Sequence, residues 1–112
     1  MPGIVENIKN ALASGISNIL TRQTGKSKIR KNRRAALKGH KKTRAGTSLD
    51  EFPFASSKEG GKGAFVKEVD ATEQNKQGGI LSSFFRKHKI KDGDRFKAVS
   101  YTHLTLPTIY SV

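Results

Sequence analysis

Two adjacent carboxylates, Asp50 and Glu51, follow a long basic stretch of the sequence. Residues 22–44 contain eleven Lys or Arg residues and no acidic residue. Clustered cations bind the phosphates of nucleic acids, whereas carboxylate oxygens bind the divalent metal ions that often assist phosphodiester cleavage. The order of these two features predicts a phosphate-binding surface that leads into a metal site.

Further polar residues extend the candidate site beyond the adjacent carboxylates. Glu59 is a candidate second metal ligand, because it opens a Gly-rich turn in which backbone can approach a ligand closely. Asn75 and Gln77 could orient water or phosphate. The predicted catalytic residues are Asp50, Glu51, Glu59, Asn75 and Gln77, with Asp50 and Glu59 as ligands of Mg²⁺ or Mn²⁺. A purely structural role as a turn residue, a solvated carboxylate or a helix cap is the alternative for each.

Glu51 has more than one possible role. Neighbouring side chains on a strand point to opposite faces, so Glu51 can share an ion with Asp50 only if the backbone turns before Pro53. Otherwise Glu51 is a base, or it holds Arg33 or Arg34 in place.

A basic helix is expected to begin near Thr24 or Ser27, either of which could cap it, and to end near Lys38. Ile29 and Leu37 are its apolar anchors, so nearly every other side is basic. It is predicted to bind DNA phosphates through Arg30, Lys31, Arg33, Arg34 and Lys38. The alternative is a merely solvated helix, but such helices normally mix charge signs.

Composition restricts the class of protein. The chain has 112 residues, a formal net charge of +13 and no cysteine. This length predicts one domain, and the charge favours nucleic acid as partner ahead of an acidic membrane surface or an acidic protein inhibitor. The absence of cysteine excludes disulfides and thiolate zinc sites. No apolar run is long enough to span a bilayer, and residues 1–20 contain no signal-peptide core.

Two further helices are expected to position the site. Ile4, Ile8 and Leu12 recur at a spacing of four and predict a first helix that ends near Gly15. Residues 72–90 carry apolar side chains at helical spacings and predict a last helix with one buried face.

Short extended segments complete the expected fold. Residues 46–48 are predicted to form a loop, residues 52–55 an extended segment, and residues 64–69 and 95–99 strands. The predicted fold is therefore α+β: a small single domain with a short antiparallel sheet and about three helices.

The C-terminal residues read differently from the rest. Residues 98–112 contain no Lys, Arg, Asp or Glu, and residues 100–108 read SYTHLTLPT. That string resembles the translation of an adaptor used by transposase-based DNA sequencing kits. We therefore predict a domain over residues 1–97 and a non-native tail over residues 98–112, and we assign no function to His103 or Tyr110. The alternative is a natural edge strand, because Tyr, Thr, Leu and Ile favour β structure.

Four ordered motifs resemble the NucA/NucB deoxyribonucleases, small bacterial nucleases that also occur as toxic C-terminal modules of polymorphic toxins. The motifs read NRRAALKG at 32–39, DEFPFA at 50–55, EGG at 59–61 and QNKQGG at 74–79. Residues 8–15 also resemble the first helix of the family. The sequence departs from the family in two places: the strand that precedes this helix in secreted members is absent, and the tail interrupts the terminal strand.

The resemblance implies a compact α+β domain and metal-dependent endonucleolytic cleavage of DNA, with Mg²⁺ or Mn²⁺ as cofactor. DNA is the expected partner, the protein is expected to be a monomer, and no membrane partner is expected. If the chain is a toxin module, an acidic immunity protein is a second expected partner. Secretion or delivery as such a module is the expected localisation. The alternative is a non-catalytic basic module that binds nucleic acid, which explains the charge but not the ordered carboxylate and Gly motifs.

Overall fold

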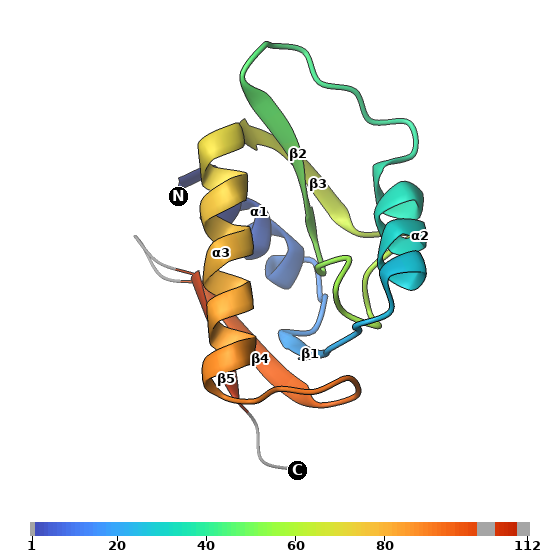
Figure 1. Ribbon diagram of the computed structural model, residues 1–112. Helices are drawn as coiled ribbons and strands as arrows, with labels where there is room; N and C mark the ends of the chain where they lie inside the picture. The colour runs from blue at the N-terminus through green and yellow to red at the C-terminus, as the bar shows by residue number, and fades with distance from the viewer. Residues whose placement is uncertain (1, 101–104, 110–112) are drawn as a thin grey trace.

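The computed structural model describes residues 2–100 and 105–109, which form three helices and five strands (Figure 1). In chain order these are α1 (Pro2–Ala13), β1 (Ile19–Thr21), α2 (Lys26–Leu37), β2 (Thr47–Phe52), β3 (Phe65–Asp70), α3 (Ala71–Lys87), β4 (Arg95–Ser100) and β5 (Thr105–Ile109). The predicted α+β fold in one small domain is confirmed. None of the described helices combines the length and the apolar character needed to cross a bilayer.

The strands form two antiparallel sheets rather than one. One sheet is the pair β2–β3, and the other has the strand order β1-β4-β5. The register of the first runs from Thr47 opposite Asp70 to Phe52 opposite Phe65. In this register Asp50 lies opposite Lys67 and Glu51 lies opposite Val66. The two adjacent carboxylates therefore lie within a paired strand.

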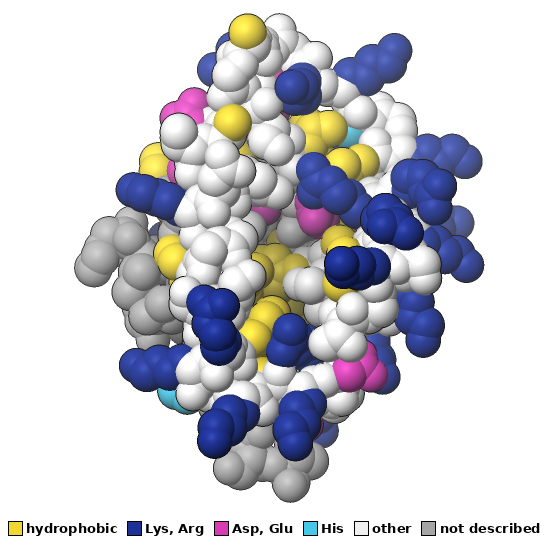
Figure 2. Space-filling model, in the orientation of Figure 1, with side chains coloured by type: hydrophobic (Ala, Val, Ile, Leu, Met, Phe, Trp, Pro, Cys, Tyr) yellow, Lys and Arg dark blue, Asp and Glu magenta, His cyan; other side chains and the backbone are white. Residues whose placement is uncertain are grey.

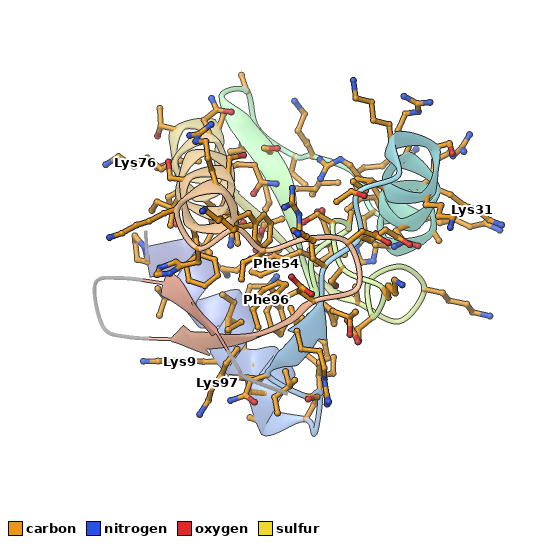
Figure 3. All side chains as sticks on the ribbon, turned by 60° about the horizontal axis from the view of Figure 1, so that its bottom comes forward. Lys9, Lys31, Phe54, Lys76, Phe96 and Lys97 are labelled. Carbon is orange, nitrogen blue, oxygen red and sulfur yellow. The ribbon has the colours of Figure 1, made fainter. Side chains whose placement is uncertain are left out.

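The hydrophobic core joins both sheets to α1 and α3. Its buried members are Ile4, Ile8, Ala11, Leu20, Phe52, Phe54, Val69, Phe85, Ile90, Phe96 and Ala98. Figure 3 shows Phe54 and Phe96 in the interior, whereas Lys31 and Lys76 project outward from α2 and α3. Removal of these apolar side chains from water supplies the main driving force for the fold.

The predicted first helix is confirmed, because Ile4 and Ile8 are fully buried against the core and α1 ends at Ala13. The predicted cap of α2 is wrong: its N-cap is Gly25, with no side-chain capping hydrogen bond. Instead, the backbone N–H of Thr24 donates to Asp92 Oδ1 at 3.0 Å, which fixes the entry of the helix.

Two strand predictions need correction. The predicted loop over residues 46–48 is wrong in part, because β2 already begins at Thr47 and pairs along its whole length with β3. The strand β1 was not predicted, because three residues are too few to show an alternating pattern. The strands expected over residues 64–69 and 95–99 are present within one residue of the expected bounds.

The backbone of β5 pairs with β4, from Phe96 opposite Ile109 to Ser100 opposite Thr105. A natural strand and a non-native tail could both form this pairing, so the domain boundary after residue 97 stays a prediction. His103 and Tyr110 lie outside the described residues.

The Gly-rich turn after β2 has a steric requirement for glycine. A Cβ atom on Gly60 would lie 2.2 Å from the carbonyl oxygen of Phe54, far inside van der Waals contact. The same oxygen accepts hydrogen bonds from the backbone N–H of Ser57 at 2.9 Å and from its hydroxyl at 2.7 Å. The EGG motif therefore closes a tight turn that carries Glu59 toward β1, where Lys58 N–H donates to Thr21 O at 2.8 Å.

Candidate active site

The two adjacent carboxylates of β2 point to opposite faces of the β2–β3 sheet. Asp50 accepts a hydrogen bond from Asn7 of α1, whereas Glu51 accepts one from Arg33 of α2. This alternation is what strand geometry requires of neighbouring residues. Asp50 and Glu51 therefore serve different parts of the site.

Asp50 is held inside the protein by a side chain that sequence reasoning missed. Asp50 is only 1% exposed to solvent. Asn7 Nδ2 lies 3.1 Å from Asp50 Oδ2, 3.3 Å from Asp50 O and 3.1 Å from Phe65 O. One amide thus fixes the carboxylate and ties α1 to both strands of the sheet.

The other oxygen of Asp50, Oδ1, is buried and has no hydrogen-bond partner among the described residues. Burial raises the pKa of Asp50 to about 7; the Asn7 hydrogen bond and Arg33 oppose this shift, and Glu51 adds to it. A carboxyl with a pKa near neutrality can exchange a proton at physiological pH, or gain stability in its charged form from a nearby cation.

Of the two polar candidates on α3, the structure buries one. Gln77 is 6% exposed, and Asn75 is exposed. Gln77 Nε2 and Gln74 Oε1 are buried without a hydrogen-bond partner among the described residues. Gln74 Nε2 donates to Leu49 O at 3.4 Å, which places Gln74 against β2 one residue before Asp50. Through Gln74, α3 therefore adds a polar group next to β2.

Glu51 makes an ion pair with Arg33, at 2.8 Å between Oε2 and Nη1. Arg33 also donates to Leu49 O at 3.3 Å, so it connects α2 to β2 at both Leu49 and Glu51. Burial raises the pKa of Glu51, and the Arg33 charge opposes that shift. The contact between Glu51 and Arg33, which was one of the alternatives expected for Glu51, is present. A role of Glu51 as a base stays a prediction.

Glu59 lies in a different environment from Asp50. Its two carboxylate oxygens accept hydrogen bonds from Thr21 of β1, from N–H at 2.7 Å and from Oγ1 at 2.8 Å. The side chains of Asp50 and Glu59 have different hydrogen-bond partners in the part of the chain that the structure describes, Asn7 and Thr21 respectively. The two predicted metal ligands are therefore not joined by a shared hydrogen-bond partner.

At Asp50 the structure offers one carboxylate oxygen, Oδ1, that is buried and has no hydrogen-bond partner among the described residues. The described part of the chain contains no group of three or more His, Cys, Asp or Glu side chains arranged to hold a metal ion. Mg²⁺ commonly binds through one or two carboxylates, water and substrate phosphate oxygens. Asp50 Oδ1 is an oxygen of the type that Mg²⁺ binds, and in this structure it is shielded from solvent.

The predicted DNA-binding side chains gather on one side of the molecule. Figure 2 shows Lys and Arg side chains along the side of the molecule that carries α2. A surface hollow of about 920 Å³ is lined by Arg30, Lys31, Arg33, Arg34, Ala35, Leu37 and Lys38. All five predicted DNA-binding residues therefore border one hollow, although Arg33 is also committed to Glu51.

One cation of the basic stretch has a structural role instead. The guanidinium of Arg22 lies 4.4 Å from the centroid of the Phe85 ring and donates a hydrogen bond to Ile90 O. A cation over an aromatic face, with its donors satisfied by backbone, stabilises the fold. Arg22 therefore contributes to the core region and not to the hollow of α2.

The position of α2 relative to the carboxylates is fixed by Asn32. Its Nδ2 donates to Ala55 O at 3.2 Å and to Ser57 O at 3.0 Å, in the segment that follows β2. Asn32 and Arg33 together fasten the basic helix beside the acidic strand. The NRR and DEFPFA motifs thus meet in space.

Asn7→Leu tests the role of the buried amide. The substitution should lower the free energy of unfolding by about 1–3 kcal/mol, because it leaves buried acceptors of Asp50 and Phe65 without their donor. Urea unfolding would measure the loss. Asn10→Leu, an exposed position on the same helix, is the matched control and should change stability by less than about 0.5 kcal/mol. Equal effects at both positions would contradict the role of Asn7.

Asp50→Asn tests the burial of the carboxyl in metal-free protein. The pKa of Asp50 is raised from 3.8 to about 7, so its protonated form stabilises the fold below pH 4 and this contribution is lost as pH rises to about 7. The stability of Asp50→Asn relative to wild type should therefore increase between pH 4.5 and 7.5. Each pKa unit corresponds to about 1.4 kcal/mol, so the change should amount to a few kcal/mol. A difference that does not vary with pH would contradict the raised pKa.

Comparison with known proteins places this geometry in a family. No curated protein matches the chain. Residues 8–99 match the family model of Deoxyribonuclease NucA/NucB, which confirms the resemblance seen in the motifs. The match includes both carboxylates of β2, the basic helix α2 and the polar face of α3. The chain belongs to the NucA/NucB deoxyribonuclease family, and it is a nuclease whose substrate is DNA.

Proposed function

We propose that this chain is a metal-dependent endonuclease that hydrolyses DNA phosphodiester bonds with little sequence preference. The observation that carries the proposal is Asp50: a buried carboxyl with an unpartnered oxygen and a pKa of about 7, in a strand fastened to the basic helix. The alternative, a non-catalytic basic module, gives no reason to bury such a carboxyl, because burial of an ionisable group costs folding stability.

Substrate binding is proposed to occur along α2. Arg30, Lys31, Arg34 and Lys38 border the hollow on this helix and would contact DNA phosphates. Phosphate contacts position DNA without reading its bases, so cleavage should occur at many sequences. Arg33 keeps 40% of its side chain exposed while it pairs with Glu51, so it could contact a phosphate from a fixed position.

Asp50 is the proposed metal ligand, through Oδ1, with water and substrate phosphate completing the coordination. When bound, a divalent cation supplies charge that polarises the scissile phosphate and stabilises the leaving oxygen. Asn7 holds the other oxygen of Asp50 and so fixes the direction of Oδ1. Glu59 is the weaker candidate ligand, because both of its oxygens already accept hydrogen bonds from Thr21.

We further propose that the domain is a delivered toxin module whose producer protects itself with an acidic inhibitor. The formal net charge of +13 and the cations on α2 support this proposal, because they would attract an acidic protein electrostatically. A docked inhibitor would cover the same surface that binds phosphates.

Plasmid cleavage with and without metal tests the proposed activity. The wild-type protein should cleave plasmid DNA at many sites in Mg²⁺ or Mn²⁺ and lose this activity in EDTA. Asp50→Asn should reduce the cleavage rate by about 100-fold or more, because it removes the charge that would hold the cation. Its DNA affinity in EDTA should stay within about twofold of wild type, since the phosphate contacts remain.

Glu59→Gln is the matched control for the loss of one carboxylate, and it should reduce the rate much less than Asp50→Asn. Near-normal cleavage by Asp50→Asn would contradict the assignment of the site. DNA binding by wild type without cleavage in either metal would favour the non-catalytic module.

A further inference from the structure

The connection between α2 and β2 carries three cations beyond Lys38 that the proposed DNA surface does not yet include: Lys41, Lys42 and Arg44. Residues 38–46 contain Lys38, Lys41, Lys42 and Arg44, and every residue of this segment is exposed. In Figure 1 the segment arches from the end of α2 across to β2. Figure 2 shows Lys and Arg side chains continuing from the α2 side toward this arch. We call residues 38–46 the basic loop.

A single carboxylate on β3 fastens the basic loop to the sheet. Glu68 accepts hydrogen bonds from the N–H of Thr43 at 3.1 Å, the hydroxyl of Thr43 at 2.7 Å and the N–H of Arg44 at 3.1 Å. The hydroxyl of Thr47 also donates to Glu68, and Arg44 Nε lies 4.0 Å from its Oε2. Two donors of this set are backbone groups, so Glu68 determines the path of the loop itself and not just a side-chain position.

The end of the basic loop has two further ties to the sheet. Thr47 Oγ1 also lies 2.8 Å from Arg44 O, so its one hydroxyl proton is shared between this carbonyl and Glu68, and Ala71 N–H donates to Gly46 O at 3.0 Å. Glu68 lies opposite Leu49 in the β2–β3 register, on the face that also carries Glu51. The basic loop and the Arg33 side chain are thus held by acidic residues of the same face.

An acidic side chain that is hydrogen-bonded to a cationic loop has two opposing effects on the binding of a polyanion. Its negative charge repels phosphate, so its removal should by itself strengthen DNA binding. Its hydrogen bonds order the loop, so its removal should disperse the cations and weaken binding. The hydrogen bonds from Thr47 and Thr43 lower the pKa of Glu68 to about 2, so the carboxylate stays charged at neutral pH.

We propose that the basic loop is a second DNA-contact element and that Glu68 is the positioning residue that orders it, an inference that rests on the proposed endonuclease function. Lys41 and Lys42 bind phosphates of the strand held along α2, since Lys38 joins the helix directly to the loop. Arg44 keeps 68% of its side chain exposed beside Glu68 and adds a third cation.

Glu68→Gln distinguishes ordering from charge through the sign of the change in DNA affinity. The variant should bind DNA at least about threefold more weakly than wild type at moderate salt, although it carries one negative charge fewer. Glu6→Gln is the matched control, because it removes a carboxylate that is 61% exposed on α1 and paired only loosely with Lys67 at 3.7 Å. The control should bind DNA as tightly as wild type or more tightly.

Limited trypsin digestion measures the ordering of the loop without DNA. Cleavage after Lys41, Lys42 and Arg44 should be several-fold faster in Glu68→Gln than in wild type, and unchanged in Glu6→Gln. If Glu68→Gln fails to fold, Thr43→Ala serves instead, because it removes one donor to Glu68 without changing the charge and should shift both measurements in the same direction.

A double variant, Lys41→Ala with Lys42→Ala, tests the DNA contact directly. The slope of log affinity against log salt should fall by about one to two, as expected for the loss of one or two phosphate contacts. An unchanged slope, or unchanged or tighter DNA binding by Glu68→Gln, would overturn the proposal. Plasmid cleavage by wild type is scored separately, so failure of the loop proposal and failure of the proposed function give different results.

Discussion

The rest of the site depends on the burial of one carboxylate, Asp50, against the amide of Asn7. A carboxylate is stable in the interior only if it is hydrogen-bonded, paired or protonated. The Asn7 amide satisfies one oxygen and also binds the carbonyl of Phe65, so α1, β2 and β3 must dock together to form this contact. The remaining oxygen is buried and has no hydrogen-bond partner among the described residues.

The β2–β3 sheet separates two tasks by its two faces. The face toward α1 carries Asp50 and Phe52, so the buried carboxyl lies beside a core side chain. The opposite face carries Glu51 and Glu68, which hold Arg33 and the basic loop respectively. Acidic residues on this face therefore position cations, and alternation along a strand is sufficient to produce the division.

The sequence predicted the elements whose signals are local. The spacing of Ile4 and Ile8 predicted α1, and the dense cations of residues 26–38 predicted a basic helix. The ordered motifs predicted the family, and two of them meet in the fold, where Gly60 of the EGG motif lies under the carbonyl oxygen of Phe54 in DEFPFA. Local signals do not report the pairing of distant segments, so the strands β1 and β2 were missed, and the extended segment expected over residues 52–55 coincides with β2 only at Phe52.

Long-range contacts also explain what was missed in the site. Asn7 shares the apolar face of α1 with Ile4 and Ile8, and a polar residue on such a face is a visible signal. Its partner, however, lies 43 residues away in the chain. The prediction that Glu59 is a second metal ligand rested on the Gly-rich turn that follows it and stays a prediction, whereas its contact with Thr21, 38 residues away, has no local signal.

The position of bound Mn²⁺ is the most direct test of Asp50 as the metal-binding carboxylate. Anomalous scattering from crystals grown with Mn²⁺ and a short DNA duplex would locate the ion. We expect a peak within coordination distance of Asp50 Oδ1, at about 2.1 Å, with phosphate oxygens among the other ligands. A peak at Glu59, or at any site without contact to Asp50, would contradict this role.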